Sequence, residues 1–104
     1  MYIINLFIKI TRITMERKLT IKEFLRVFDY IRSTGEQLNN RYKLGDIYAW
    51  HDYDGYTCWL NYKDVTVTLM FHGSLNVEYD KLANYSDFTH QCLAMLATND
   101  KENM

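Results

Sequence analysis

The sequence predicts an α+β fold, namely a four-stranded antiparallel meander sheet with two helices packed on one face, in the order α-β-β-β-β-α. Three observations support this prediction. Apolar residues repeat at helical spacing over 21–31, alternating β-branched and aromatic runs with short turn signals fill 47–79, and a second helical pattern follows. Because the 104 residues contain no Pro and no low-complexity run, a single domain over 1–104 is expected.

Residues 1–14 show the period of a strand. The even positions are apolar and polar residues occupy three of the odd positions, namely Ile4, Leu6, Ile8 and Ile10 against Asn5, Lys9 and Thr11. Three interpretations stay open: an additional N-terminal edge strand that could pair with another chain, a poorly ordered extension, and a translation start at Met15, which would leave the preceding residues outside the natural protein. The run is too short and too polar to span a membrane, so no membrane partner is expected.

A first helix is predicted over 21–34. Thr20 and Glu23 have the spacing of a capping box, in which the Thr hydroxyl accepts a hydrogen bond from the Glu amide and the Glu carboxylate accepts one from the Thr amide. One helical face then carries the apolar residues Ile21, Phe24, Leu25, Phe28 and Ile31. Gly35 is expected to end the helix in the left-handed conformation.

Asp54-Gly55 is the strongest turn signal in the chain. Between alternating apolar runs, such a pair is typical of a two-residue type I′ hairpin turn, in which both residues have positive φ. This turn joins the predicted strands 47–53 and 56–62, and it sets the register between them.

Two further loops complete the predicted meander. Lys63-Asp64 is a second two-residue loop and leads into a strand over 65–72. A three-residue loop at 72–74 leads into the last strand, 75–79. Both hairpins assign the same alternating residues to one face of the sheet, and this agreement supports the predicted register.

The stretches before and after the predicted sheet are less regular. Residues 36–41 are mostly polar and are expected to form a loop, after which a strand is expected to begin at 42–44 and to be interrupted at Gly45. The second helix is expected to begin near Asn84 or Ser86, with Ser86 as its N-cap, and to fray over 99–104.

Charge and cysteine content limit the function classes. The formal net charge is −1, from 12 basic and 13 acidic residues, so no general attraction to nucleic acid or to an anionic membrane is expected. Two cysteines are too few for a disulfide framework, and the N-terminal run lacks the features of a signal peptide. The expected location is the cytoplasm, and no cofactor is expected, because a chain of this size can close a core unaided.

His51, Cys58 and Cys92 are the residues that suggest metal or nucleophile chemistry. The register places His51 opposite Cys58 on the core face, and the second helix could bring Cys92 above them. They lack the spacings of known zinc motifs, and a thiol that faces the core lacks the accessible, electropositive surroundings of a reactive thiolate. We therefore expect three ordinary core residues, with a cryptic Cys/His or metal-dependent enzyme as the third-ranked function.

The opposite face of the predicted sheet carries the residues of greatest functional interest. Trp50 lies opposite Trp59 there, with Tyr48 and Met70 on the same face. Large aromatics on the solvent face of a small sheet favour an interaction surface, since Trp and Tyr bury a large area at low entropic cost. Two alternatives are that the N-terminal run covers these residues, or that they stack on each other.

Three segments of the chain resemble a known type of family. The segments are Val27-Phe28-Asp29-Tyr30-Ile31-Arg32, Asp52-Tyr53-Asp54-Gly55-Tyr56-Thr57 and Thr68-Leu69-Met70-Phe71-His72. Together they resemble the small uncharacterised proteobacterial domain families whose members are single compact chains, over about 19–79. The resemblance implies a bacterial cytoplasmic accessory protein, and it carries over no catalytic residues.

The expected function is a small, non-enzymatic protein-interaction module. It is expected to form a homodimer or to bind a protein partner through Tyr48, Trp50, Trp59 and Met70. The second-ranked function is single-stranded nucleic-acid binding, in which bases would stack on the same rings. Nucleic acid is disfavoured as a partner because the charges expected near that face are balanced.

Overall fold

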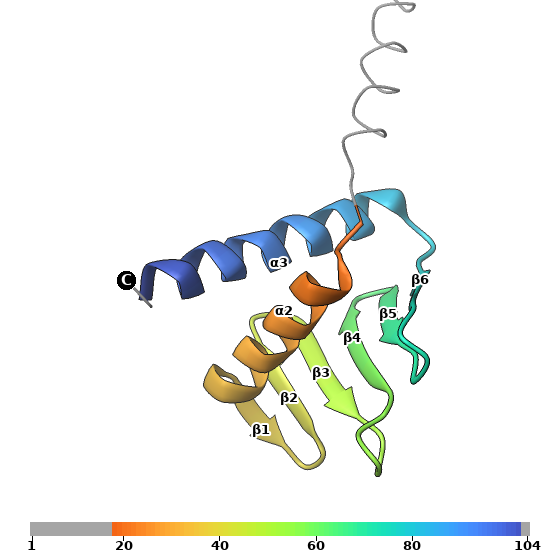
Figure 1. Cartoon of the computed structure of the whole chain (residues 1–104). Coiled ribbons are helices and arrows are strands. Elements are labelled where there is room, and N and C mark those ends of the chain that lie inside the picture. Colours follow the sequence, from red (N-terminus) through yellow and green to blue (C-terminus); the bar gives the residue numbers. More distant parts are fainter. Residues whose placement is uncertain (1–17, 103–104) are drawn as a thin grey trace, which may run out of the picture.

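The structure is a computed structural model that describes residues 18–102 of the chain (Figure 1). Its elements, in chain order, are α2 (Ile21–Thr34), β1 (Glu36–Leu38), β2 (Arg41–Leu44), β3 (Ile47–His51), β4 (Cys58–Tyr62), β5 (Val65–Leu69), β6 (Leu75–Glu78) and α3 (Leu82–Glu102). The α+β class and the two helices are confirmed. The predicted N-terminal strand over 1–14 lies outside the described residues.

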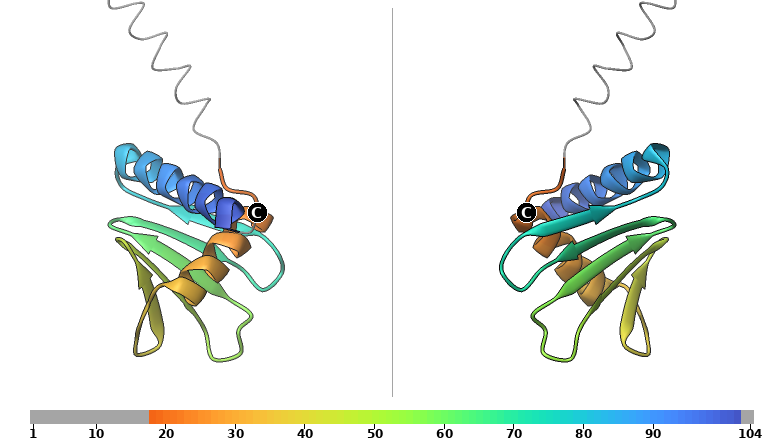
Figure 2. Two further views of the ribbon diagram at one scale, coloured as in Figure 1. Left: turned by 90° about the vertical axis from the view of Figure 1, so that its left-hand side faces the viewer. Right: turned by 90° about the vertical axis from the view of Figure 1, so that its right-hand side faces the viewer.

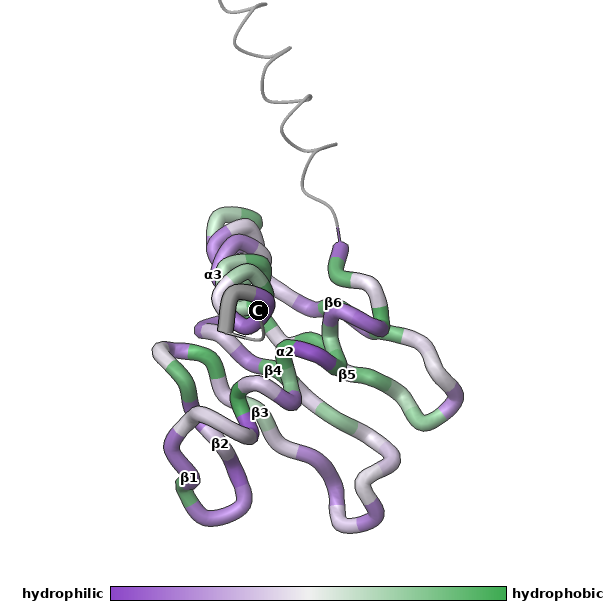
Figure 3. The backbone as a smooth tube through the Cα atoms, turned by 60° about the vertical axis from the view of Figure 1, so that its left-hand side comes forward, coloured by the Kyte–Doolittle hydropathy of each residue, from purple (hydrophilic) through white to green (hydrophobic). Residues whose placement is uncertain are grey.

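The sheet is a six-stranded antiparallel meander in the order β1-β2-β3-β4-β5-β6. The prediction of four strands was wrong, because 36–44 form the hairpin of β1 and β2, where a loop over 36–41 and only the beginning of a strand at 42–44 were expected. Asn39 stands at its turn with φ 58°, a conformation that Asn tolerates better than most residues. The hairpin is mostly hydrophilic (Figure 3), and β1 is exposed along its whole length. Such an edge strand does not need the apolar alternation that identifies buried strands.

Both helices pack on one face of the sheet (Figure 2). α2 contacts β2 and β3, α3 contacts β5, and the two helices contact each other. The residues of the core are Leu19, Phe24, Val27, Phe28, Ile31, Ile47, Ala49, Leu60, Tyr62, Val65, Val67, Tyr85, Phe88, Cys92 and Leu96. Ile21 and Leu25, which share the predicted apolar face of the first helix, are exposed instead.

α2 begins as predicted but ends differently. The Glu23 N–H donates to Thr20 Oγ1 and the Thr20 N–H donates to Glu23 Oε1, both at 3.0 Å, so the capping box is confirmed. Gly35 has φ −82° and ψ 178°, which is extended backbone and not the predicted left-handed cap. An ideal Cβ at Gly35 would lie 2.5 Å from the carbonyl oxygen of Lys43. Gly35 is therefore explained by the close approach of β2, which leaves no space for a side chain.

α3 is longer at both ends than predicted. It begins at Leu82, so Ser86 lies inside the helix and is not its N-cap. It continues to Glu102, where a frayed tail was expected. The Arg26 guanidinium of α2 forms an ion pair with the Asp100 carboxylate, which joins the last turns of α3 to α2.

Asp64, in the turn between β4 and β5, holds the beginning of α3. Its Oδ2 atom accepts hydrogen bonds from the backbone amides of Asp80 and Lys81, at 2.6 and 2.8 Å. Its Oδ1 atom accepts one from the side-chain amide of Asn84. These bonds, led by that from Lys81, lower the pKa of Asp64 to about 2. The helix thus receives its cap from a distant turn, and this is why the local sequence suggested the wrong start.

The register of the central strands was predicted correctly. β3 pairs with β4 so that Trp50 lies opposite Trp59, and β4 pairs with β5 so that Tyr62 lies opposite Val65. The four predicted strands are all shorter than expected. In the last hairpin the observed pairing is displaced by two residues from the predicted one, and a displacement of two leaves every side chain on its predicted face.

The turn between β3 and β4 is not of type I′. The Gly55 N–H donates to the carbonyl oxygen of Asp52 at 3.0 Å, so Tyr53 and Asp54 are the central residues of the turn. In this loop, the residue with positive φ is Gly55, at 77°. The Asp52 N–H donates to the carbonyl oxygen of Thr57 at 3.0 Å, which continues the pairing beyond the strands. Because the longer loop shortens both strands equally, the register is unchanged.

Candidate functional site

One face of the sheet carries no described helix, and we call it the open face. It consists of the alternate residues of the six strands that point away from α2 and α3. These residues are Glu36, Leu38, Arg41, Lys43, Tyr48, Trp50, Trp59, Asn61, Thr66, Thr68, Asn76 and Glu78. Tyr48, Trp50 and Trp59 therefore lie on the face where the register predicted them. Met70 follows the last residue of β5 and lies in the loop to β6.

The two indoles at the centre of the open face are stacked. The ring centroids of Trp50 and Trp59 are 5.7 Å apart, and their planes differ by 12°, an offset-stacked arrangement. The guanidinium of Arg41 lies over the Trp50 ring, with Cζ 4.1 Å from the centroid, as in a cation–π contact. Arg41 comes from β2 and Trp59 from β4, on either side of β3, so both faces of the Trp50 ring are in contact. We call these three residues the Arg-Trp-Trp stack.

A second set of contacts runs beside the Arg-Trp-Trp stack. The Lys43 Nζ atom lies over the ring of Tyr48, 5.6 Å from its centroid. The side-chain amide of Asn61 donates to the carbonyl oxygen of Val65 at 3.0 Å and to Thr66 Oγ1 at 3.1 Å. The neighbours of the stack are thus ordered as well, so the centre of the open face is a pre-formed surface.

The aromatic rings of the open face are partly buried although neither α2 nor α3 covers them. Trp50, Trp59 and Tyr48 are half-buried, and Thr68, the pairing partner of Trp59, is 8% exposed. The charged residues at open-face positions are Glu36, Arg41, Lys43 and Glu78, two of each sign. The face is therefore aromatic at its centre and electrically balanced.

His51, Cys58 and Cys92 do not form a metal site. Across residues 18–102, no three His, Cys, Asp or Glu side chains come close enough to hold a metal ion. His51, expected in the core, is exposed at the end of β3. Burial raises the pKa of Cys92 to about 12, and burial followed by the charge of Asp52 raises the pKa of Cys58. Both thiols are therefore protonated at neutral pH, whereas a nucleophilic cysteine requires the thiolate.

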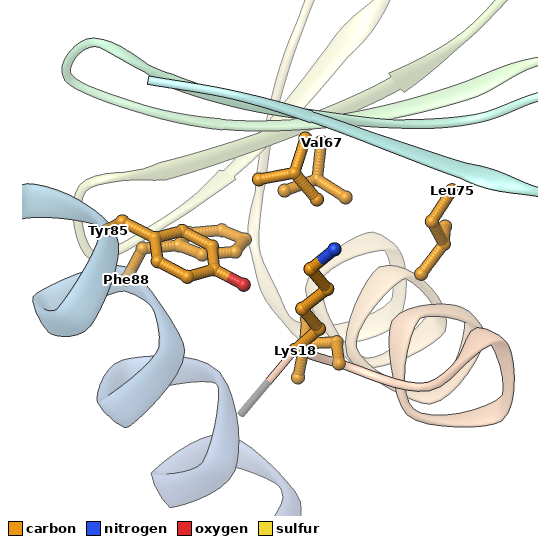
Figure 4. Close-up of a pocket in the computed structure, with 7 residues that line it drawn as sticks. Lys18, Val67, Leu75, Tyr85 and Phe88 are labelled. Atoms are coloured by element: carbon orange, nitrogen blue, oxygen red, sulfur yellow. The ribbon is translucent and has the colours of Figure 1, made fainter. Parts of the chain in front are cut away.

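A small cavity lies between the start of α3 and strands β5 and β6 (Figure 4). Its volume is about 30 Å³, and its lining includes the apolar side chains of Val67, Leu75 and Phe88. In Figure 4 the Lys18 side chain extends across the cavity toward Val67. Because the space suffices for only about one or two water molecules, it is not a candidate ligand site.

The comparisons with known proteins identify the family. A family model described as "Protein of unknown function (DUF3081)" matches residues 19–102. The chain belongs to this family. The DUF3081 match confirms the resemblance to an uncharacterised domain family and extends it to the end of α3. Curated proteins and solved structures give no match.

Among the described residues, the open face is the main candidate site because it carries the Arg-Trp-Trp stack. Between residues 18 and 102, neither helix combines the length and the apolar character that a membrane span requires. Arg41 was not predicted to contact Trp50, because the predicted loop over 36–41 included it and the strand of 42–44 was expected to begin after it. One signal for it was present: 41–44 alternate charged and apolar residues between two turn pairs, Asn39-Asn40 and Gly45-Asp46.

Proposed function

We propose that this protein is a small, non-enzymatic interaction module that binds a protein partner or a second copy of itself through the open face. The observation that carries the proposal is the Arg-Trp-Trp stack on a sheet face that no described helix covers. Trp, Tyr and Arg are the residue types that most often dominate the binding energy of protein interfaces.

Because the side chains of the open face are already held in place, the entropic cost of binding a partner is lower. A flexible side chain loses rotamer freedom when it enters an interface, at about 0.5–1.5 kcal/mol for each long side chain. Arg41 is already placed on Trp50 and Trp50 on Trp59, so much of that freedom is lost before a partner arrives. Burial of the exposed ring edges then contributes about 25 cal/mol for each Å² of apolar area removed from water.

Two features favour protein over single-stranded nucleic acid as the partner. Nucleic-acid binders of this type offer free aromatic faces on which bases stack. Here one face of Trp50 contacts Arg41 and the other contacts Trp59, so a base would have to displace one of them. The open-face charges also sum to zero, whereas phosphate binding requires an excess of Lys and Arg.

Other properties of the chain fit a role without catalysis. The elevated pKa values of Cys58 and Cys92 keep both thiols protonated, which removes the main candidate nucleophiles. Both cysteines are free, as is usual in a reducing compartment. We therefore extend the proposal to a bacterial cytoplasmic accessory protein, with a symmetric homodimer as its simplest assembly.

The test is the double variant Trp50→Ser with Trp59→Ser. We expect its far-ultraviolet circular dichroism to stay close to that of the wild type, because neither residue belongs to the core between sheet and helices. Light scattering should show a dimeric wild type and a monomeric variant. If the wild type is monomeric, a partner identified by mass spectrometry should be captured from the native host by the wild type but not by the variant.

The matched control replaces two aromatic residues that lie outside the open face. Tyr56→Ser with Phe71→Ser changes two exposed aromatics in the hairpin loops and should leave the assembly intact. Equal assembly of the wild type and the Trp variant would refute the proposal. Tight binding of a single-stranded oligonucleotide by the wild type, lost in the Trp variant, would favour the nucleic-acid function instead.

A further inference from the structure

A second candidate site, which is polar, lies between the β1–β2 hairpin and the loop that follows β3. It is a hollow of about 390 Å³ lined by Asn40, Tyr42, His51, Asp52 and Tyr53. Tyr42 and His51 occupy strand positions on the helix-bearing side, so the hollow is separate from the Arg-Trp-Trp stack on the open face. Its lining combines two phenol rings, an imidazole, a carboxylate and a carboxamide.

The imidazole of His51 has a defined orientation. Its Nδ1 atom lies 2.7 Å from the carbonyl oxygen of Asp52. A carbonyl oxygen only accepts hydrogen bonds, so Nδ1 must carry the proton and donate. In the neutral ring Nε2 is then an acceptor. The ring also contacts Phe28 of α2, with centroids 6.4 Å apart, which limits its movement.

Asp52 supplies a negative charge to the same hollow. Its Oδ1 atom accepts a hydrogen bond from the Thr57 N–H at 3.2 Å, which fixes the carboxylate within the β3–β4 loop. Among the described residues, no Lys or Arg forms an ion pair with Asp52. Arg32 interacts electrostatically with Tyr42, but its guanidinium is bound to Asp29 at 2.6 Å. The charge of Asp52 is therefore available to a ligand.

The two tyrosines add aromatic faces to this acceptor-rich lining. Tyr42 is half-buried, whereas Tyr53 is 102% exposed and so makes almost no contact with the rest of the protein. The face of a phenol ring attracts cations through its quadrupole. A carboxylate, an imidazole acceptor and two phenol rings together suit a cation that also donates hydrogen bonds.

We propose that this hollow binds an organic cation bearing N–H groups, either a guanidinium or a primary ammonium. The cation would donate to Asp52 and to Nε2 of His51 while the rings of Tyr42 and Tyr53 contact its flat or alkyl surface. An Arg or Lys side chain of a polypeptide and a free alkylguanidine share this chemistry. The site is independent of the open face, so neither proposal rests on the other.

The experiment is an NMR titration of the ¹⁵N-labelled full chain with N-acetyl-arginine amide. We expect saturable shifts of the amides of 40–42 and 51–53, with affinity in the millimolar range typical of one weakly enclosed charged group. Tetramethylammonium has the charge but no N–H group, and it should bind about tenfold more weakly. N-acetyl-glutamine amide has no charge and should cause no saturable shift.

Two variants and a control complete the test. Asp52→Asn keeps an oxygen acceptor for the Thr57 amide and removes the charge, so it should weaken binding about tenfold. Tyr53→Ser, at a fully exposed position, should weaken it a few-fold without affecting folding. Asp54→Asn removes a carboxylate of the same loop that does not line the hollow, and it should bind like the wild type.

The titrations distinguish a polypeptide side chain from a free small molecule as the source of the cation, and they can also refute the proposal. Tighter binding of the arginine amide than of methylguanidine points to a polypeptide side chain, and the reverse order points to a free small molecule. The proposal is overturned if no saturable shift occurs at these amides, or if the Asp52 and Asp54 variants respond equally.

Discussion

The two faces of the sheet use the same strands but bury their side chains in different ways. On the helix-bearing face, Ile47, Ala49 and Leu60 are fully buried because α2 and α3 cover them. On the open face, Trp50 and Trp59 are half-buried because they cover each other and Arg41 covers one of them. Packing between layers leaves no surface for a partner, whereas stacking within one layer leaves the ring edges exposed. The first face therefore supplies stability, and the second is the face through which we propose that the protein binds a partner.

The largest expected effect on stability is seen when a Leu→Ala substitution on the helix-bearing face is compared with one on the open face. Leu60→Ala removes a side chain that is 0% exposed and should lower the free energy of unfolding by about 3 kcal/mol. Leu38→Ala removes an open-face side chain that is 39% exposed and should cost less than about 1 kcal/mol. Urea denaturation followed by circular dichroism measures both. Equal losses would contradict the assignment of one face to the core.

The next largest effect on stability is expected at Gly35, which lies between α2 and β1 and joins the helix layer to the sheet. A Cβ at Gly35 would lie 2.5 Å from the Lys43 carbonyl oxygen and 2.6 Å from that of Ile31, and both are backbone atoms that cannot move alone. Gly35→Ala should therefore destabilise the protein by about 2 kcal/mol. Gly55→Ala is the control: its site has open space but φ +77°, so the cost should be only about 1 kcal/mol. A harmless Gly35→Ala would mean that the layers are further apart than described.

A substitution of Asp64 measures how strongly the start of α3 is held against the helix-bearing face. Its folded pKa of about 2 lies below the ordinary value of 3.8, so the carboxylate stabilises the fold above about pH 4 and loses this effect as the pH falls toward 2. Asp64→Asn should lower the melting temperature by a few degrees at pH 7, and the difference from the wild type should shrink below pH 4. Thermal denaturation at several pH values checks this. A difference between Asp64→Asn and the wild type that stays constant from pH 7 to pH 2 would disprove the cap.

The smallest effect concerns the open face alone. Arg41→Gln removes the cation from Trp50 and should cost about 0.5–1 kcal/mol of stability. It should also change the tryptophan fluorescence, because the guanidinium lies 4.1 Å from that ring. Arg32→Gln is the control, since Arg32 is paired with Asp29 on α2, away from both indoles. Identical spectra for the two variants would show that Arg41 does not occupy the stack in solution.

The sequence predicted the candidate site in part. It placed Trp50 opposite Trp59 because β-branched and aromatic residues alternate on both sides of Asp54-Gly55. It did so although the turn type was wrong, since the register depends on the symmetry of the loop and not on its backbone angles. It did not show that Arg41 completes the stack, because β1 is exposed along its whole length and lacks the apolar alternation by which strands are recognised, so that the first hairpin was not predicted.

The sequence by itself determined the features that depend on residues close together in the chain. These are the capping box of Thr20 and Glu23, the strand periodicity of 47–69, and the assignment of side chains to the two faces of the sheet that follows from that periodicity. Tertiary structure decided the rest. The start of α3 depends on Asp64, 16 residues before the amide of Asp80, and the need for Gly35 depends on a carbonyl of β2. Local hydrogen bonds and side-chain alternation recur at fixed short spacings and can be read from the sequence. A contact between distant residues has no such spacing, so it becomes visible only when the chain is folded.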